Sequence, residues 1–496
     1  MIRWIRIVFF IFCMQVFGLT AYGQEMFGIV NSNFAGVNSL PINPGDMVNS
    51  KLYLDINLVT ADLFFENNYL YIHKEDYQFL EFFKKDPDLP SYGEDGVLFD
   101  HYWDKNDKDI FISMRLIGPS VMIVDRDNAI AISTSVRSAT SIWKLPYDIA
   151  NFAYEDLRYD PQHNIRFPDA DFLAASLTWS EIGLSYARVI KSDFRHRFSV
   201  GSTVKRLFGY AGVYLKGHTL DYLVDNTDGS GRLDADIYTL DAEIGFSVPI
   251  DYSGNDINYP ENLTKGKGYS IDLGFTYQKR EWQNPAKKSR KLCSQPYEDY
   301  LYKIGVSLLD LGYIRFNENA EKHIFNDVRN YHWDYINQFS PTSVNDMMRE
   351  LSGRFYNGDS TRSLVSNEFS FLLPTALSLQ VDYHYKKDWY FNGTVIYPLL
   401  LGPAQIYRPP QLSVAVRYET RYLEFNLPVI LYRFSDPRIG FSVRVWNVTI
   451  GSDNLGGFFS FSDFTGLDIY ASLKLSFTKG ICFSFKRSYG CQDLEF

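Results

Sequence analysis

The segment Tyr269–Arg280, with the sequence YSIDLGFTYQKR, decides the fold because its side chains alternate with a period of two. A β-strand points successive side chains to opposite faces, so this segment has one apolar and one polar face. Its length suits a tilted strand that crosses hydrocarbon, which needs about 9–11 residues, and exceeds the ~5–6 residues usual in soluble sheets. The apolar face consists of Tyr269, Ile271, Leu273, Phe275 and Tyr277.

The same alternation recurs from about Asp236 to the end of the chain. Short turns and longer polar connections separate the segments, as in a barrel with tight turns at one rim and long loops at the other. We therefore predict an all-β fold, an antiparallel transmembrane β-barrel of about 14 strands within a range of roughly 12–18. The clearest further segments are Thr239–Val248, Leu377–Tyr385, Leu412–Glu419, Ile439–Val445 and Ile469–Phe477.

A soluble β-sandwich or propeller is the alternative, since its strands also alternate. Such folds bury the apolar face and use shorter strands. Here the polar face carries many ionisable groups and the apolar face runs without interruption over five positions in Tyr269–Tyr277. Lipid outside and water inside explain both features, so the barrel is favoured.

The first residues indicate export. Arg3 and Arg6 precede an apolar run from Ile7 to about Leu19, and Ala21-Tyr22-Gly23 places small residues before Gln24. This is the layout of a cleaved secretory signal peptide, predicted at residues 1–23. An uncleaved membrane anchor is the alternative, but a spanning helix needs about 20 apolar residues. Export together with a barrel predicts location in the outer membrane of the cell.

Composition narrows the partners. Aromatic residues make up 17% of the chain, with 36 Tyr and 39 Phe, and barrels concentrate such residues at both membrane interfaces. The net charge is −10 and no long basic run is present, whereas phosphate binding needs clustered Lys and Arg. We expect outer-membrane lipid as a partner, with other envelope proteins as further candidates, and no nucleic acid.

The N-terminal half is less regular than the rest. We predict strands at its start, a hairpin in the middle, two short helices and then two long strands. The predicted strands and hairpin are Leu52–Leu58, Asp109–Ile117, Val121–Ser135, Phe172–Val189 and Phe198–Leu215, and the helices are Lys74–Lys85 and Pro146–Leu157.

One insertion interrupts the alternation between Phe316 and Ser370. Glu318–Phe339 and Ser343–Phe355 are predicted as helices, with Ser340-Pro341 between them. We interpret residues 318–365 as a helical element outside the membrane or in the lumen, joining two strands.

Three motifs carry a family resemblance. They are Gly28–Asn38 followed by Asn43-Pro44, Leu308–Phe316, and Ile450–Leu455. Together they resemble an uncharacterised family of Bacteroidota outer-membrane β-barrels. That family is more distantly similar to the FadL-type long-chain fatty-acid transporters and to the FadL-like barrel of the type IX secretion system.

The resemblance implies a barrel of residues 52–496 with an N-terminal segment, residues 24–51, folded inward as a plug. The motifs mark topology more than chemistry. Asparagine side chains can satisfy irregular backbone inside a wet lumen, where a loop facing lipid could not persist. The insertion near 318–365 departs from the FadL pattern. This departure weakens the inference that the chain transports fatty acids as FadL-type proteins do. The plug residues are Asn31, Asn33, Asn38, Asn43 and Pro44.

The polar faces of the strands supply the candidate site residues. They line either a path for a solute or a packed lumen in which charges pair with the plug and with one another. The lumen-lining candidates are Asp241, Glu243, Asp272, Arg280, Gln380, Asp382, Arg417, Glu419, Arg444 and Lys474.

Metal and catalytic signals are weak. Asp225, Asp228 and Asp234 could hold calcium in an external loop, but Ile237 stands where an EF-hand loop needs its bidentate acid, and a Gly-rich turn is the simpler interpretation. We therefore expect no metal and no cofactor. No G-x-S-x-G motif is present, and we expect no enzymatic activity.

Two functions remain. The first is FadL-like passage of hydrophobic or amphiphilic solutes, and the alternative is a non-transporting scaffold subunit of an envelope machine for secretion, gliding or barrel assembly. Analogy of fold is weak evidence for either.

Overall fold

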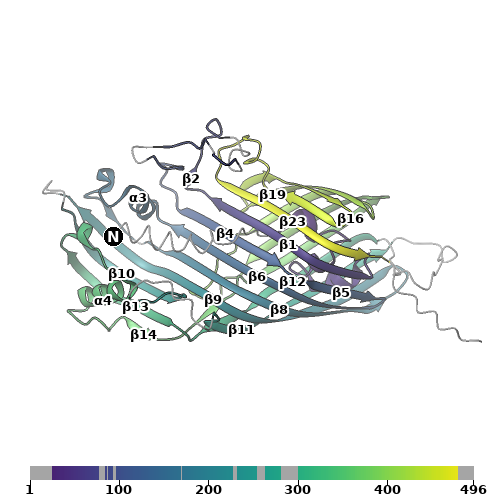
Figure 1. Cartoon of the computed structure of the whole chain (residues 1–496), viewed down its shortest axis with the longest axis horizontal. Helices are drawn as coiled ribbons and strands as arrows, with labels where there is room; N and C mark the ends of the chain where they lie inside the picture. The colour runs from purple at the N-terminus through teal and green to yellow at the C-terminus, as the bar shows by residue number, and fades with distance from the viewer. Residues whose placement is uncertain are drawn as a thin grey trace, which may run out of the picture.

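The computed structural model describes residues 25–77, 84–86, 88–92, 96–168, 170–226, 232–253, 263–280 and 300–478. These residues form a closed antiparallel β-barrel of 14 strands, which confirms the predicted fold class (Figure 1). The ring closes where β1 (Leu54–Asn67) pairs with β23 (Gly466–Phe477), from Leu54 opposite Phe477 to Glu66 opposite Gly466. The predicted signal peptide, residues 1–23, lies outside the described residues.

At three places in the wall, two short strands that follow each other in the chain pair with the same neighbouring strand and together count as one strand of the barrel. β4 and β5 both pair with β1 and β6 and are separated by Gly118-Pro119, and β15 and β20 likewise precede β16 and β21. After β1 the wall consists of β4 (Lys108–Ile117), β5 (Ser120–Asp125), β6 (Asn128–Leu145), β8 (Phe172–Ser192), β9 (His196–Asp225), β11 (Gly266–Arg280), β12 (Tyr300–Phe316), β15 (Phe369–Leu372), β16 (Ala376–Lys386), β17 (Trp389–Pro398), β18 (Gln411–Glu419), β19 (Leu423–Tyr432), β20 (Asp436–Ile439), β21 (Phe441–Val445), β22 (Val448–Ser452) and β23.

Large apolar side chains cover the outside of the wall. Ile182 is 52% exposed, Val429 50% and Leu379 45%, while polar side chains at alternating positions are buried. This polarity is the reverse of that in a soluble sandwich. It suits a wall that meets hydrocarbon on its outer face.

The wall extends well beyond one membrane crossing at one end (Figure 1). β9 has 30 residues, whereas a crossing needs about 9–11. Its first part pairs with β11, and its second part, Gly212–Asp225, pairs with β10 (Asp234–Ser247). β13 (Ala320–Trp333) then pairs with β10, and β14 (Leu364–Ser366) with β13. We call Gly212–Asp225 with β10, β13 and β14 the extension.

The structure corrects the predicted insertion. The helix predicted at Glu318–Phe339 is wrong, because Ala320–Trp333 is a strand and only Ile336–Gln338 forms a short 3-10 helix, η6. Asp327 and Asn330 adopt positive φ angles of 58° and 49°, and these local irregularities break the period of two. The second prediction is confirmed by α4 (Val344–Phe355), which begins at the N-cap Ser343.

The remaining elements are short. α3 (Tyr147–Glu155) confirms the helix predicted at Pro146–Leu157, and the middle of the helix predicted at Lys74–Lys85, residues 78–83, lies outside the described residues. Within the described part of the chain, no helix has the length and apolar character needed to cross a membrane. The other elements are α2 (Phe27–Val30), η1 (Gly36–Ser39), η2 (Pro44–Asn49), β2 (Leu70–Tyr71), β3 (Asp100–His101), η4 (Asp160–Gln162) and β7 (Arg166–Phe167).

Candidate functional site

Residues 25–51, here called the N-terminal segment, lie inside the barrel, and none of their side chains is exposed. The segment folds into the three short turns α2, η1 and η2 rather than into a strand. η2 begins at Pro44, whose fixed φ suits the first position of a helix, and the side chain of its N-cap Asn43 accepts a 2.8 Å hydrogen bond from the Gly45 N–H. Irregular backbone of this kind persists inside a barrel because protein encloses it.

Five asparagines of the N-terminal segment reach five different wall strands. Each donates through its side-chain amide, so the segment is held on several sides at once. The bonds run from Asn31 to Thr394 (3.1 Å), Asn33 to Glu419 (3.0 Å), Asn38 to Ser472 (3.0 Å), Asn43 to Gln380 (2.9 Å) and Asn49 to Ser199 (3.0 Å).

Glycines in the wall allow the segment to lie flat against it. A Cβ atom added at Gly201 would lie 2.5 Å from the carbonyl oxygen of Pro44, and one added at Gly274 would lie 2.6 Å from the Gly45 nitrogen. Only a residue without a side chain permits this approach of backbone to backbone.

The first charged cluster of the lumen is centred on Arg417, which has no exposed surface. Its guanidinium lies 2.9 Å from both Asp382 and Glu419 and donates to the Asn31 carbonyl at 2.7 Å. Lys51 of the N-terminal segment contacts the same Glu419 at 3.0 Å. Three of the predicted lumen-lining residues therefore meet at one point and include the segment in their network.

The second charged cluster is centred on Asp310. Arg137 donates to both of its carboxylate oxygens at 3.0 Å, and Lys205 contacts Asp310 and Asp272 at 2.7 Å each. Among these residues, only Asp272 was predicted from the sequence to line the lumen. The hairpin predicted at Val121–Ser135 ended before Arg137, whereas the strand predicted at Phe198–Leu215 already contained Lys205, which the polar face of that strand could have revealed.

The other predicted residues lie in different surroundings. Arg444 pairs with Glu424 at 2.9 Å, and Lys474 donates to the carbonyl oxygens of Phe34 and Ala35 in the N-terminal segment. Arg280 is the last residue of β11 and is half-buried.

Asp241 and Glu243 lie on β10 in the extension and do not contact the N-terminal segment. Asp241 pairs with Arg329 of β13 at 3.0 Å. Glu243 accepts a 2.5 Å hydrogen bond from Tyr214 and pairs with Lys322 at 2.8 Å. Both carboxylates thus join neighbouring strands of the extension.

An apolar groove of about 620 Å³ lies between the wall and the helices that follow β6 and β13. Ile142 lines the groove, while the next residue, Trp143, stacks on Tyr407 with ring centroids 4.5 Å apart. Tyr407 precedes Arg408, which pairs with Glu25 of the N-terminal segment inside the barrel. Adjacent strand residues point to opposite faces, so the groove lies on the outer side of the wall.

The lining of this groove is almost wholly aliphatic and aromatic. Ala174 of β8 and Leu215 of β9 lie opposite each other in register and form part of its floor, and Phe152 of α3 and Met347 of α4 lie across from them. Lys108 is the one charged residue among the lining residues, and Asp104 neutralises it at 2.6 Å. A cavity of this size and character falls in the range that binds small apolar ligands.

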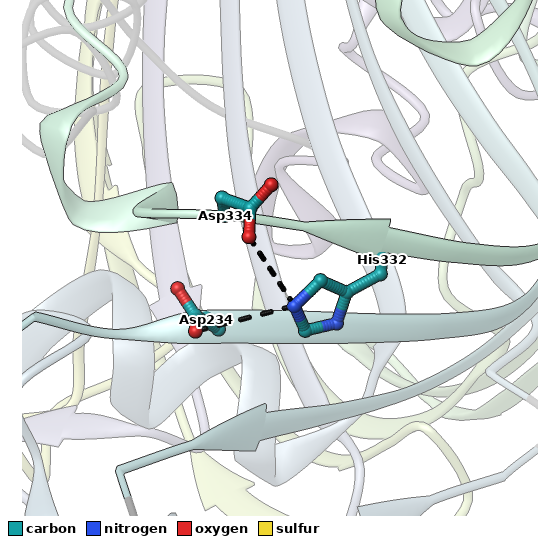
Figure 2. Close-up of side chains that lie close together, drawn as sticks. All are labelled: Asp234, His332 and Asp334. Carbon is teal, nitrogen blue, oxygen red and sulfur yellow. Dashed lines mark ion pairs between the residues drawn. The ribbon is translucent and has the colours of Figure 1, made fainter. Parts of the chain in front are cut away.

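A small cluster of titratable groups lies on the extension (Figure 2). The Nε2 atom of His332 lies 3.4 Å from Asp334 and 4.0 Å from Asp234. Its Nδ1 atom lies 2.7 Å from Asp236. Asp234 belongs to the predicted calcium set. Asp225 lies opposite it in register, and Asp228 falls outside the described residues. Ion pairs with His332 account for the positions of the Asp234, Asp236 and Asp334 carboxylates.

Replacing Asp236 with asparagine is expected to lower the pKa of His332. The Asp236 carboxylate is the main cause that raises this pKa above its ordinary value. Because the pKa in the folded protein is raised, the pair stabilises β10–β13 below the ordinary histidine pKa, about 6.5, and this contribution is lost as the pH rises through the folded pKa. NMR titration of the His332 imidazole protons measures this pKa. Asp125→Asn, near the opposite rim, is the control, and an unchanged titration of His332 in Asp236→Asn contradicts the assignment.

Comparison with solved structures finds barrels at very low identity. A deltaS2S3 mutant of TodX, a monoaromatic hydrocarbon channel, is 9% identical with a TM-score of 0.40 over 93% of this chain and 100% of that one. The toluene transporter TodX of Pseudomonas putida is 9% identical with a TM-score of 0.29, covering 93% and 99%. A Pseudomonas aeruginosa FadL homologue is 10% identical with a TM-score of 0.26, covering 92% and 98%. Likeness at this level carries no information on what this chain binds.

Sequence comparison gives one assignment. No curated protein matches the chain. A family described as "Family of unknown function (DUF5723)" matches residues 44–453, from η2 in the N-terminal segment to the residue after β22. This match covers most of the barrel and part of its interior segment. The chain therefore belongs to this family, DUF5723.

Proposed function

We propose that this protein is an outer-membrane barrel that binds a hydrophobic or amphiphilic solute in the apolar groove and passes it across the membrane. The observation that carries the proposal is the groove itself. Soluble and membrane proteins rarely leave a large apolar hollow without an occupant, because unfilled apolar surface in water is unfavourable.

The position of the groove supports capture from outside the hydrocarbon. It lies against β8 and β9 at the end of the wall that carries the extension, and α3, η6 and α4 enclose it. Leu220, Tyr222 and Val224 continue its lining along the extension. An apolar solute that reaches this surface from water exchanges hydration for contact with aliphatic side chains. The expected ligand class is therefore an acyl chain or an aromatic hydrocarbon.

Passage through the barrel requires the N-terminal segment to move. Three cavities beside the N-terminal segment or elsewhere in the lumen have volumes of only about 20, 30 and 40 Å³, enough for single water molecules. The asparagine contacts and the Lys51–Glu419 ion pair are polar, so water can replace them when the segment shifts. The segment is accordingly proposed as the gate.

A substitution that fills the groove tests the binding step. Ala174→Trp places an indole in the floor of the groove and is expected to weaken binding of parinaric acid, a fluorescent fatty acid, by about tenfold or more. Fluorescence titration of the purified protein in detergent measures the dissociation constant. The matched control is Ile182→Trp, on the same strand but among the exposed apolar residues of the wall. Equal affinity in the two variants contradicts ligand binding in the groove.

A non-transporting scaffold is the second candidate, and the close packing of the lumen favours it. No side chain of the N-terminal segment is exposed, and ion pairs tie the segment to the wall. In that case the apolar groove holds a segment of another envelope protein. Purification in mild detergent separates the two: a monomer whose bound apolar ligand is lost in Ala174→Trp supports transport, and a stoichiometric complex supports the scaffold.

A further inference from the structure

The outward side chains of β11 and β12 change character in a fixed order along the strands. Phe275 lies opposite Val306, Ile271 opposite Leu311, Tyr269 opposite Tyr313 and Lys267 opposite Arg315. The sequence of pairs thus runs from apolar, through a tyrosine pair, to a basic pair. Tyr269 and Tyr313 are 60% and 49% exposed, so both rings face outward from the wall.

This order marks the depth of each pair in the bilayer. Tyrosine rings on the lipid face of barrels gather where hydrocarbon meets the headgroups. The pair one step further from the hydrocarbon, Lys267 and Arg315, then lies at headgroup depth. On the neighbouring strand β9, the Arg206 guanidinium lies 4.2 Å from the centre of the Tyr269 ring and extends the basic band sideways.

A hollow of about 390 Å³ opens beside this band. Lys265, Lys267 and Arg315 supply its cations, and Glu318 and Glu368 its carboxylates. Arg315 pairs with Glu368 at 2.6 Å. In the part of the chain that the structure describes, the ammonium groups of Lys265 and Lys267 have no carboxylate within ion-pair distance.

The backbone of Lys265 is held in place by hydrogen bonds, and no carboxylate of the described residues pairs with its ammonium group. The residue is only 7% exposed. Its N–H donates to the Gly209 carbonyl at 2.8 Å, and its own carbonyl accepts from Asn317 and Glu318 at 3.3 Å. The low exposure of Lys265 as a whole limits the space its side chain can reach, and the residue lines the open hollow together with Lys267 and Arg315. Three cations gathered at one hollow form a site suited to an anion from outside the chain.

We propose that Lys265, Lys267 and Arg315 bind the anionic phosphate of a membrane-lipid headgroup, whose acyl chains lie along Tyr269, Tyr313 and the apolar wall below. The adjoining tyrosine pair selects a lipid over free phosphate, since it places the site where the headgroups lie. Basic residues at this depth attract anionic lipid through charge as well as through hydrogen bonds. The site is on a different part of the wall from the apolar groove and is independent of transport.

Lipid retention in detergent tests the proposal. The full protein is incubated with phosphatidic acid and phosphatidylcholine of the same acyl chains, and bound lipid is counted by native mass spectrometry. The expected preference for phosphatidic acid is about tenfold, and Lys265→Gln/Lys267→Gln abolishes it. The matched control is Lys386→Gln/Lys387→Gln, two lysines at the β16–β17 turn, which keeps the preference.

Three outcomes overturn the site. Equal retention of the two lipids by the unaltered protein removes the basis for headgroup recognition. Loss of the preference in both double variants indicates a general effect of charge. Competition by inorganic phosphate as effective as that by phosphatidic acid indicates a soluble-anion site instead. Lys267→Gln alone, at an exposed position, provides a folded variant with a reduced preference if the double variant does not fold.

Discussion

Replacing Arg417 with methionine is expected to lower the free energy of unfolding by about 3–5 kcal/mol, because it removes the cation that two buried carboxylates share. Asp382 and Glu419 each lie 2.9 Å from the Arg417 guanidinium, and all three side chains are buried. Methionine matches the length of the arginine stem but supplies no charge. Lys51 alone then faces Glu419, and Asp382 loses its ion pair. Denaturant unfolding of the refolded barrel, followed by tryptophan fluorescence, measures the change.

The control for this variant is Arg329→Met. Arg329 also forms a close arginine–aspartate pair, 3.0 Å from Asp241, but the pair is on the extension and largely in water. Little change in stability is expected there, since exposed ion pairs contribute little. If the two variants unfold alike, the Arg417 cluster does not contribute as a buried network.

Removing residues 25–51 is expected to convert a barrel that does not conduct ions into one that does. The N-terminal segment fills the lumen against β16–β18 and β23, and the hollow left between Asn31, Asn43 and Asp382 holds only about 20 Å³. Barrels of eight strands are filled by side chains and those of 16–18 leave an aqueous channel, so a wall of 14 strands without its interior segment should admit water and ions. Single-channel recording in planar bilayers measures the conductance.

The deletion needs a check of folding and a comparison. Heat-modifiable migration in a denaturing gel shows whether the shortened barrel closes. Asn43→Ala, which removes the amide donated to Gln380 but keeps the segment, is expected to give at most brief openings. A folded deletion variant that stays silent contradicts the role of the segment as the barrier.

The alternation of residues predicted the barrel because period two is imposed by strand geometry and needs no partner information. The same rule identified Asp382, Arg417 and Glu419 as members of the polar face, and the structure brings these three together. It could not show that they meet the N-terminal segment, since Asn33 and Glu419 are 386 residues apart in the sequence.

The errors and omissions have local causes. At β13, Asp327 and Asn330 break the alternation, and the remaining pattern was interpreted as a helix. The Asp310 cluster was missed because Asp310 lies at an irregularity of β12, between Leu308 and Leu311, which changes the face of the wall on which each residue lies. The apolar groove could not be predicted from the sequence, because Ile142 has the same outward-facing position in the alternation as residues that meet lipid.

The pairing of β1 with β23 sets the order in which this molecule can be assembled. Residues at the two ends of the wall, such as Leu54 and Phe477, must find each other across almost the entire polypeptide, a search that is slow compared with forming neighbouring hairpins. The N-terminal segment shares in that final event, because Asn38 contacts Ser472 on the last strand. Closure of the barrel and final packing of the N-terminal segment are therefore one step. A chain truncated before β23 completes neither.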